Sequence, residues 1–187
     1  MDALVASFVA AFLGEWGDRT QLLLAVLAAR TGRPGAAFGG IALAVLAASL
    51  FAGFAGATLV GMIPIRAAGL LVALALCLAG LAGLFRRKPP NPGSLSIPLF
   101  AAALIMALAA QIGDRTPFIT FALAARFDAP LLAAAGAAAG ALAACVPAAL
   151  LGDTLAKTVP LRAIRLVSAA LFLIAGIATG LSALRLV

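Results

Sequence analysis

Long apolar segments alternate with short polar breaks along the whole chain. Six such segments run approximately over residues 3–30, 35–60, 67–85, 97–125, 129–151 and 163–184. Most of them reach the roughly 17–25 residues that a helix needs to cross a bilayer. The breaks between them carry proline, glycine and charged residues, which are typical of loops. The pattern therefore predicts an all-α integral membrane protein with six transmembrane helices.

The composition supports a membrane-embedded chain rather than a soluble domain. Of 187 residues, 65% are hydrophobic and 10% are charged, and the mean hydropathy is +1.22. Such a chain lacks the polar residues that cover a soluble globule. The formal charge of +7 lies mostly between the apolar segments, so it indicates topology and not nucleic-acid binding. Because Cys77 and Cys145 lie inside apolar segments and histidine is absent, neither a disulfide nor a cysteine-based metal site is expected.

The chain also contains an internal duplication. A shift of 96 residues places Asp18 on Asp114 and, without a gap, Pro64 on Pro160. Chance matches are common in a sequence rich in alanine and leucine, but matches of aspartate, arginine and proline at one constant offset are not. The offset therefore indicates that one three-helix unit occurs twice.

This duplication divides the chain into a first repeat (1–85), a linker (86–96) and a second repeat (97–187). Because each repeat has an odd number of spans, we expect the second copy to enter the membrane from the opposite side. Inverted repeats that share a site at the membrane midplane are typical of secondary transporters.

The basic residues predict the orientation of the chain. The loops after the first, third and fifth segments hold eight of them, which are Arg30, Arg33, Arg86, Arg87, Lys88, Lys157, Arg162 and Arg165. The opposite side holds three, which are Arg66, Arg126 and Arg185. Since cytoplasmic loops carry the excess of lysine and arginine, we expect the linker 86–96 in the cytoplasm and both termini outside.

Two polar clusters interrupt the apolar pattern. Residues 14–20 read GEWGDRT and residues 111–116 read QIGDRT, within the first and fourth segments, which are long enough to tilt or break. A charged side chain at the bilayer centre costs about 2.5–3.5 kcal/mol on insertion scales. Such residues persist only where they pair, face a wet cavity or bind an ion. We therefore interpret the two clusters as halves of one cation-transport site.

The residue types in these clusters favour a hard cation. On a continuous helix, Glu15 and Asp18 share a face and Arg19 lies close to both. If the repeats pack face to face, the metal ligands Glu15, Asp18, Gln111 and Asp114 converge. The supporting residues are expected to be Arg19, Thr20, Arg115 and Thr116. An oxygen-only ligand set suits Ca²⁺, Mn²⁺ or Mg²⁺ rather than Zn²⁺ or Cu⁺. Burial favours the protonated carboxyl group and a bound cation favours the carboxylate, so protons and a dication compete for such a site.

The two clusters resemble the Glu-x-Gly-Asp-(Lys/Arg)-(Thr/Ser) signature of the GDT family, a branch of the cation/Ca²⁺ exchanger superfamily. The resemblance covers nearly the whole chain. It implies transport of Mn²⁺ or Ca²⁺ in exchange for protons, with Glu15, Asp18 and Asp114 as ion ligands and no permanently bound cofactor. It also suggests a manganese exporter of the bacterial inner membrane. Gln111 departs from the signature, since the family usually has glutamate there.

Other interpretations stay open at this stage. The charged residues could merely pair to hold helices together, or the chain could transport another cation or a cationic solute. An intramembrane enzyme is poorly supported, because no serine or cysteine lies beside a base on a recognisable motif. A non-transporting scaffold leaves the charges at midplane depth unexplained. Two small-xxx-small patterns, at residues 136–140 and 176–180, could serve packing within the chain or a homodimer.

Overall fold

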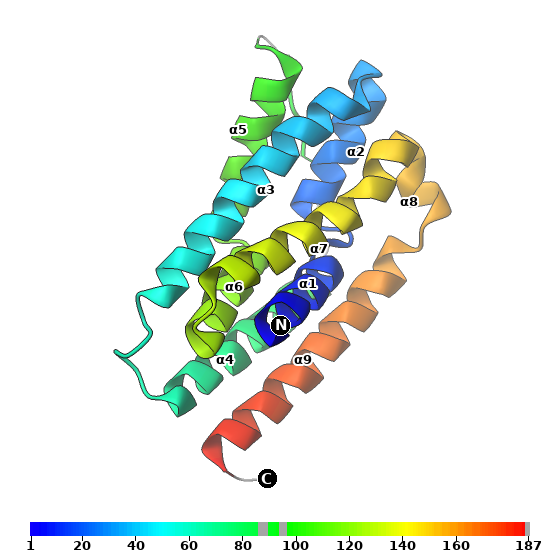
Figure 1. Cartoon of the computed structure of the whole chain (residues 1–187). Coiled ribbons are helices and arrows are strands. Elements are labelled where there is room, and N and C mark those ends of the chain that lie inside the picture. The colour runs from blue at the N-terminus through cyan, green and yellow to red at the C-terminus, as the bar shows by residue number, and fades with distance from the viewer. Residues whose placement is uncertain (86–89, 94–96, 186–187) are drawn as a thin grey trace.

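The computed structural model describes residues 1–85, 90–93 and 97–185 (Figure 1). The elements are α1 (Asp2–Glu15), α2 (Arg19–Thr31), α3 (Pro34–Ala57), α4 (Ile65–Leu84), α5 (Leu99–Gln111), α6 (Arg115–Phe127), α7 (Pro130–Leu151), the 3₁₀ turn η1 (Gly152–Thr154), α8 (Leu155–Thr158) and α9 (Leu161–Leu184). No strand occurs within these described ranges, and the predicted all-α fold is confirmed. Most of the predicted linker 86–96 lies outside the described residues.

Four of the predicted segments are continuous helices. They correspond to α3, α4, α7 and α9, whose ends lie within a few residues of the predicted ones. Pro34 and Pro130 stand in the first turn of α3 and α7, where a missing backbone N–H costs nothing because that N–H has no partner within the helix. The loop signals in the sequence therefore mark the real helix starts.

The first and fourth predicted segments, whose length allows a break, are not continuous helices. The first is divided into α1 and α2, and the fourth into α5 and α6, with three residues between the halves in each case. Helices α5 and α6 are bent by 64° at their break. Each break falls at one of the two polar clusters, where glycine and charged residues interrupt the apolar pattern.

Several helices are long and apolar enough to cross a membrane. In the described part of the chain they are α3, α4, α9 and the continuous segment Pro130–Thr158, and the bent pair α5 and α6 passes the same criterion together. Large apolar side chains such as Phe51, Leu150 and Ile174 are exposed on the outer faces of these helices. In water such a surface would be unfavourable, and in lipid it is the expected one. The chain is therefore an integral membrane protein.

The two halves of the chain pack against each other through equivalent residues. A Cβ atom at Gly40 in α3 would collide with the carbonyl oxygen of Phe100 in α5. A Cβ atom at Gly136 in α7 would collide with that of Leu4 in α1. The shift of 96 residues relates Gly40 to Gly136 and Leu4 to Phe100. The shift therefore maps the contact between α3 and α5 onto the contact between α7 and α1. The two repeats pack against each other reciprocally.

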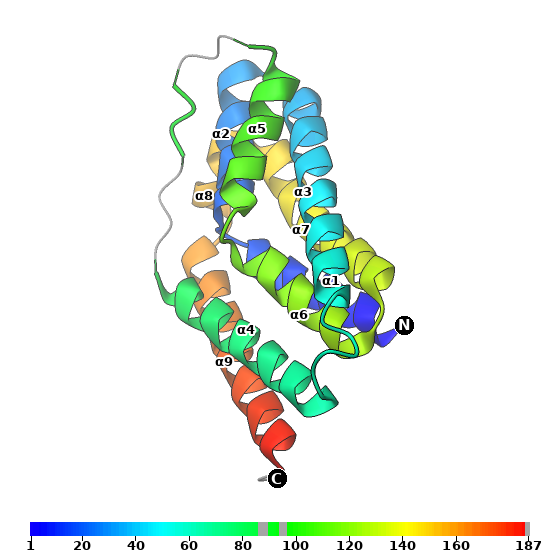
Figure 2. The same cartoon turned by 90° about the vertical axis from the view of Figure 1, so that its left-hand side faces the viewer.

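The same reciprocity holds for α4 and α9, which lie side by side at one end of the molecule (Figures 1 and 2). A Cβ atom at Gly80 would lie 2.9 Å from the carbonyl oxygen of Ala169, and one at Gly176 would lie 3.0 Å from that of Ala73. Both small-xxx-small patterns thus face other helices of the same chain, where small residues permit close helix packing.

Candidate functional site

Both polar clusters lie at a break between two helices. Gly17, between α1 and α2, has a φ angle of 70°, and Gly113, between α5 and α6, has a φ angle of 71°. Residues with a Cβ atom rarely adopt this conformation, so glycine makes each break possible. Asp18 and Asp114 follow with extended backbone as the N-cap residues of α2 and α6. Each aspartate thus stands at the positive end of a half-helix, where a negative charge is favoured.

The structure brings the acids of the two clusters together. Glu15 and Asp18 are 0% exposed, and Gln111 and Asp114 are 6% exposed. Asp114 interacts electrostatically with both Glu15 and Asp18. Three carboxyl groups from opposite halves of the sequence therefore share one buried site. Of the four predicted ligands, these interactions join Glu15, Asp18 and Asp114.

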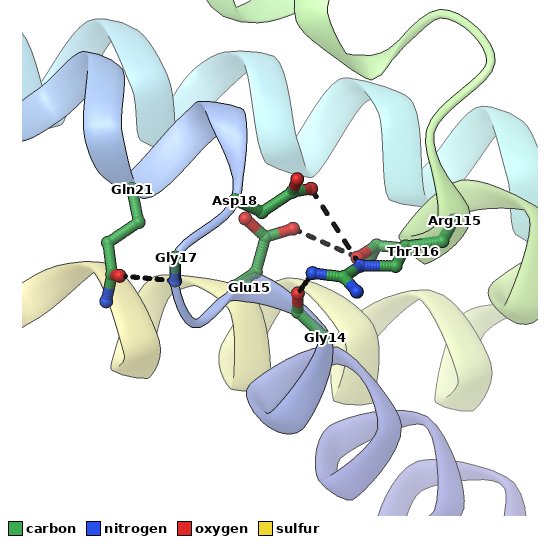
Figure 3. A network of polar contacts seen from close by, with 7 residues as sticks. All are labelled: Gly14, Glu15, Gly17, Asp18, Gln21, Arg115 and Thr116. Atoms are coloured by element: carbon green, nitrogen blue, oxygen red, sulfur yellow. Dashed lines mark hydrogen bonds and ion pairs between the residues drawn. The ribbon is translucent and has the colours of Figure 1, made fainter. Parts of the chain in front are cut away.

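Arg115 connects the second cluster to the first (Figure 3). Its guanidinium group donates a hydrogen bond to the carbonyl oxygen of Gly14 at the end of α1. Its Nε atom lies 3.9 Å from Oδ2 of Asp18, and the side chain is only 6% exposed. On its other side the group lies against α4, since a Cβ atom at Gly83 would be 3.2 Å from Nη1 of Arg115. A buried positive charge is thus held directly beside the acids.

Glu15 and Gln111 have buried oxygen atoms that are not satisfied by hydrogen bonds. The hydroxyl group of Thr116 donates a hydrogen bond of 3.0 Å to Oε1 of Glu15. Within the described residues, Oε2 of Glu15 and Oε1 of Gln111 have no hydrogen-bond partner. A buried polar oxygen without a partner is costly. These two oxygens are therefore free to coordinate a cation or to accept a hydrogen bond.

The prediction that Arg19 lies close to Glu15 and Asp18 was wrong. Because α1 ends at Glu15, the helical spacing that would put Arg19 beside Glu15 and Asp18 does not apply. Arg19 is exposed at the start of α2. Its counterpart Arg115 is buried among the acids instead, although the two arginines occupy the same position of the repeated motif. Thr20, from which a hydroxyl group was expected, is buried, but no hydrogen bond joins it to the acids among the described contacts.

One residue of the site was missed by the sequence reasoning. Gln21 is 0% exposed; its Oε1 accepts a 2.8 Å hydrogen bond from the backbone N–H of Gly17, and its Nε2 donates a 2.6 Å bond to the carbonyl oxygen of Ala144 in α7. It therefore ties the first break to α7. The available signal was an amide in an apolar helix at a position where the second repeat has Pro117, which cannot make these bonds.

The acid cluster does not have the geometry of a closed metal site in this conformation. Across the described ranges, no group of three or more histidine, cysteine, aspartate or glutamate side chains is arranged to hold a metal ion. The guanidinium group of Arg115 lies beside Asp18 in this conformation and supplies a positive charge to the acid cluster.

Two cavities lie beside the two helix breaks. One, of about 640 Å³, is lined by Gly17 of the first break and by residues at the start of α9, among them Leu161 and Arg165. The other, of about 620 Å³, is lined by Arg19 and by Ala110, the residue before Gln111. Each break is thus adjacent to a cavity.

Fold and site together define a class of protein. Charged and amide side chains are buried at broken helices inside an apolar bundle, which is the arrangement of membrane transport proteins.

The comparisons with known proteins identify the family. The model of the family described as "Divalent cation/proton antiporter GDT1" matches residues 3–90 and again residues 99–186. A protein of Vibrio cholerae serotype O1 named "Putative manganese exporter" is 36% identical over 182 residues, which are 96% of this chain and 90% of the relative. No solved structure is similar enough to count as a match. The chain belongs to the GDT1 family of divalent cation/proton antiporters, a family of transporters and not of enzymes, and the resemblance seen in the two motifs is confirmed.

Proposed function

We propose that this protein is a secondary transporter that exports a divalent cation, Mn²⁺ in the first place and Ca²⁺ as a second candidate, in exchange for protons. The single observation that carries the proposal is the burial of Glu15, Asp18 and Asp114 in one site at two helix breaks. Oxygen ligands of this kind suit Mn²⁺ and Ca²⁺. The family match and the name of the Vibrio relative agree with this substrate.

The site would lie at the midplane between two inverted repeats, residues 1–85 and 97–187. Two observations support this arrangement. The family model matches once in each half, and the close glycine contacts recur with the halves exchanged. The pair α1 and α2 then counts as one broken span, as α5 and α6 do, which makes six spans in all. Broken helices at a shared site are a recurring feature of transporters with this symmetry.

Protons and the dication would alternate on the same oxygens. Glu15 Oε2 and Gln111 Oε1, which lack hydrogen-bond partners, are the first oxygens offered to the ion, and Asp18 and Asp114 complete the set. When the ion leaves, protons and the guanidinium group of Arg115 balance the acids. The site is therefore never left with uncompensated buried charge, which would be costly.

The ion would enter from the cytoplasm. In the orientation with both termini outside and the linker inside, the end of the molecule that carries α2 and α8 is cytoplasmic. The cavities beside Gly17 and Arg19 are the proposed routes by which the ion reaches the two breaks. The membrane would be the inner membrane of a bacterium, as the bacterial relative suggests.

A second candidate is transport of a monovalent cation or a cationic solute. The observation that favours it is Gln111, which is an amide where the first motif has Glu15. One acid fewer lowers the negative charge of the site, and a lower charge weakens the preference for a dication.

Transport by the purified chain in proteoliposomes tests the proposal. A pH-sensitive dye reports proton movement when Mn²⁺, Ca²⁺, Mg²⁺ or Na⁺ is added on one side. We expect a signal with Mn²⁺, and a loss of at least about tenfold in D18N and in D114N, since each removes a ligand charge. D153N is the matched control, because Asp153 is an exposed acid outside the site. Full activity of D18N and D114N would refute the site, and a signal with Na⁺ alone would favour the second candidate.

A further inference from the structure

The fold gathers three arginines around one cavity at the end of the molecule where α4 begins and α9 ends. The cavity has a volume of about 540 Å³ and is lined by Arg66 of α4, Arg126 of α6 and Arg185 after α9. These three are all the basic residues that the sequence places on that side of the membrane. They come from distant parts of the chain, so only the tertiary structure brings them together.

Among the described residues, the cavity contains arginines but no acid. Within the described residues no carboxylate lines it, and no ion pair joins any of the three arginines to an acid. Asp128 follows Arg126 closely in the sequence but is not part of the lining. Like charges gathered without a counter-ion repel one another, so the cluster favours an anion from outside the chain.

The other lining groups suit an anion with oxygen atoms. The hydroxyl groups of Thr179 and Ser182 lie on the α9 wall of the cavity. On the α4 wall, Ile65 and Arg66 form the first turn of the helix, whose N-terminus has no side-chain cap. Free backbone N–H groups and the positive end of the helix attract anions. Guanidinium groups match the geometry of a phosphate particularly well.

The surroundings of the cavity distinguish a lipid from a free anion. Helices α4 and α9 are both long enough to span the membrane. A cavity at the end of two spanning helices is expected at the depth of the lipid headgroups. Large apolar side chains flank the cavity on both helices, with Ile65 61% exposed, Leu70 38%, Leu181 38% and Leu184 56%. A phosphate in the cavity can thus continue into an acyl chain along these side chains.

We propose that this arginine cavity, formed by Arg66, Arg126 and Arg185, binds the phosphate of an anionic phospholipid in the leaflet opposite to the linker. The headgroup phosphate contacts the guanidinium groups and the hydroxyl groups, and the acyl chains lie against α4 and α9. The site is separate from the acid cluster and does not depend on which ion the protein transports.

Lipid binding by the full-length chain in detergent tests this proposal. The probes are phosphatidylglycerol, phosphatidylcholine with the same acyl chains, and inorganic phosphate, and the readouts are lipid retention in native mass spectrometry and thermal stability. The variant R66Q/R185Q removes two exposed arginines of the cavity, and R30Q/R33Q removes two exposed arginines at the opposite end. The two double variants have the same net charge, so they form a matched pair.

We expect the native chain to retain phosphatidylglycerol in preference to phosphatidylcholine. R66Q/R185Q should bind it about thirtyfold more weakly, since each basic residue near an anionic membrane surface contributes about fivefold to affinity, and R30Q/R33Q should bind it as the native chain does. Equal losses in both double variants would overturn the proposal, because they would indicate a general effect of charge. Stabilisation by inorganic phosphate equal to that by phosphatidylglycerol would overturn the lipid assignment. R126Q, measured in the same way, should weaken binding while the transport signal with Mn²⁺ persists.

Discussion

Replacing Arg115 with glutamine gives the sharpest test of how the site balances its charge. Nε of Arg115 and Oδ2 of Asp18 are 3.9 Å apart, and both side chains are buried. At this separation two unit charges attract each other by about 4 kcal/mol at an effective dielectric constant of about 20. When a dication binds to Asp18, the protein loses part of this attraction between Arg115 and Asp18. If structural relaxation and water compensate about half of this loss, the other half, about 2 kcal/mol, opposes Mn²⁺ binding in the native chain. R115Q removes this opposition and should bind Mn²⁺ about thirtyfold more tightly.

The same substitution should lower the stability of the protein without bound metal. Removing one partner of a buried pair leaves the other charge uncompensated, at a cost of about 3–5 kcal/mol. R115Q without metal should therefore melt at a lower temperature than the native chain, and added Mn²⁺ should raise its melting temperature by more than it raises that of the native chain. Because release of the ion then lacks a replacement charge, turnover in proteoliposomes should fall although binding improves.

The measurement is Mn²⁺ binding to the detergent-purified chain by equilibrium dialysis or by the Mn²⁺ electron paramagnetic resonance signal. R19Q is the matched control, because Arg19 is the same residue of the repeated motif but is exposed. R115K keeps the charge and should bind nearly as the native chain does. If folded R115Q binds Mn²⁺ no more tightly than the native chain, or if R19Q shows the same change, Arg115 is not the internal counter-ion.

Three further variants and one condition test other parts of the reasoning. Q111E restores a fourth acid, so it should bind Mn²⁺ more tightly or carry more protons per ion; an unchanged H⁺:Mn²⁺ ratio together with unchanged affinity would contradict this. Q21M removes the bonds to Gly17 and Ala144, and because each buried group left without a partner costs about 1–3 kcal/mol, we expect a lower melting temperature and slower transport. G140V should prevent close packing of α1 on α7, since a Cβ there already meets the backbone of α1, and loss of folded protein in detergent chromatography is the expected result. Lowering the pH should weaken Mn²⁺ binding to the native chain, since protons compete for the carboxylates, and binding that is independent of pH would count against exchange.

Much of this protein was predictable from its sequence, because the relevant signals are local. The cost of burying polar groups in a bilayer acts on each segment separately, so the apolar runs give the positions of α3, α4, α7 and α9 closely. The same cost marks both polar clusters as functional, since charges at that depth need a purpose. The constant offset of 96 residues between Asp18 and Asp114 then indicates that the clusters form one site.

The tertiary structure decided what the local signals leave open. The two motif copies contain the same Gly-Asp-Arg-Thr sequence, yet Arg115 is buried against α1 and α4 while Arg19 is exposed. Which of the two arginines is buried depends on contacts with helices that are distant in the sequence, and no local pattern encodes those contacts. For the same reason, only the folded molecule shows the hydrogen bonds of Gln21. The same holds for the cavity that Arg66, Arg126 and Arg185 line together.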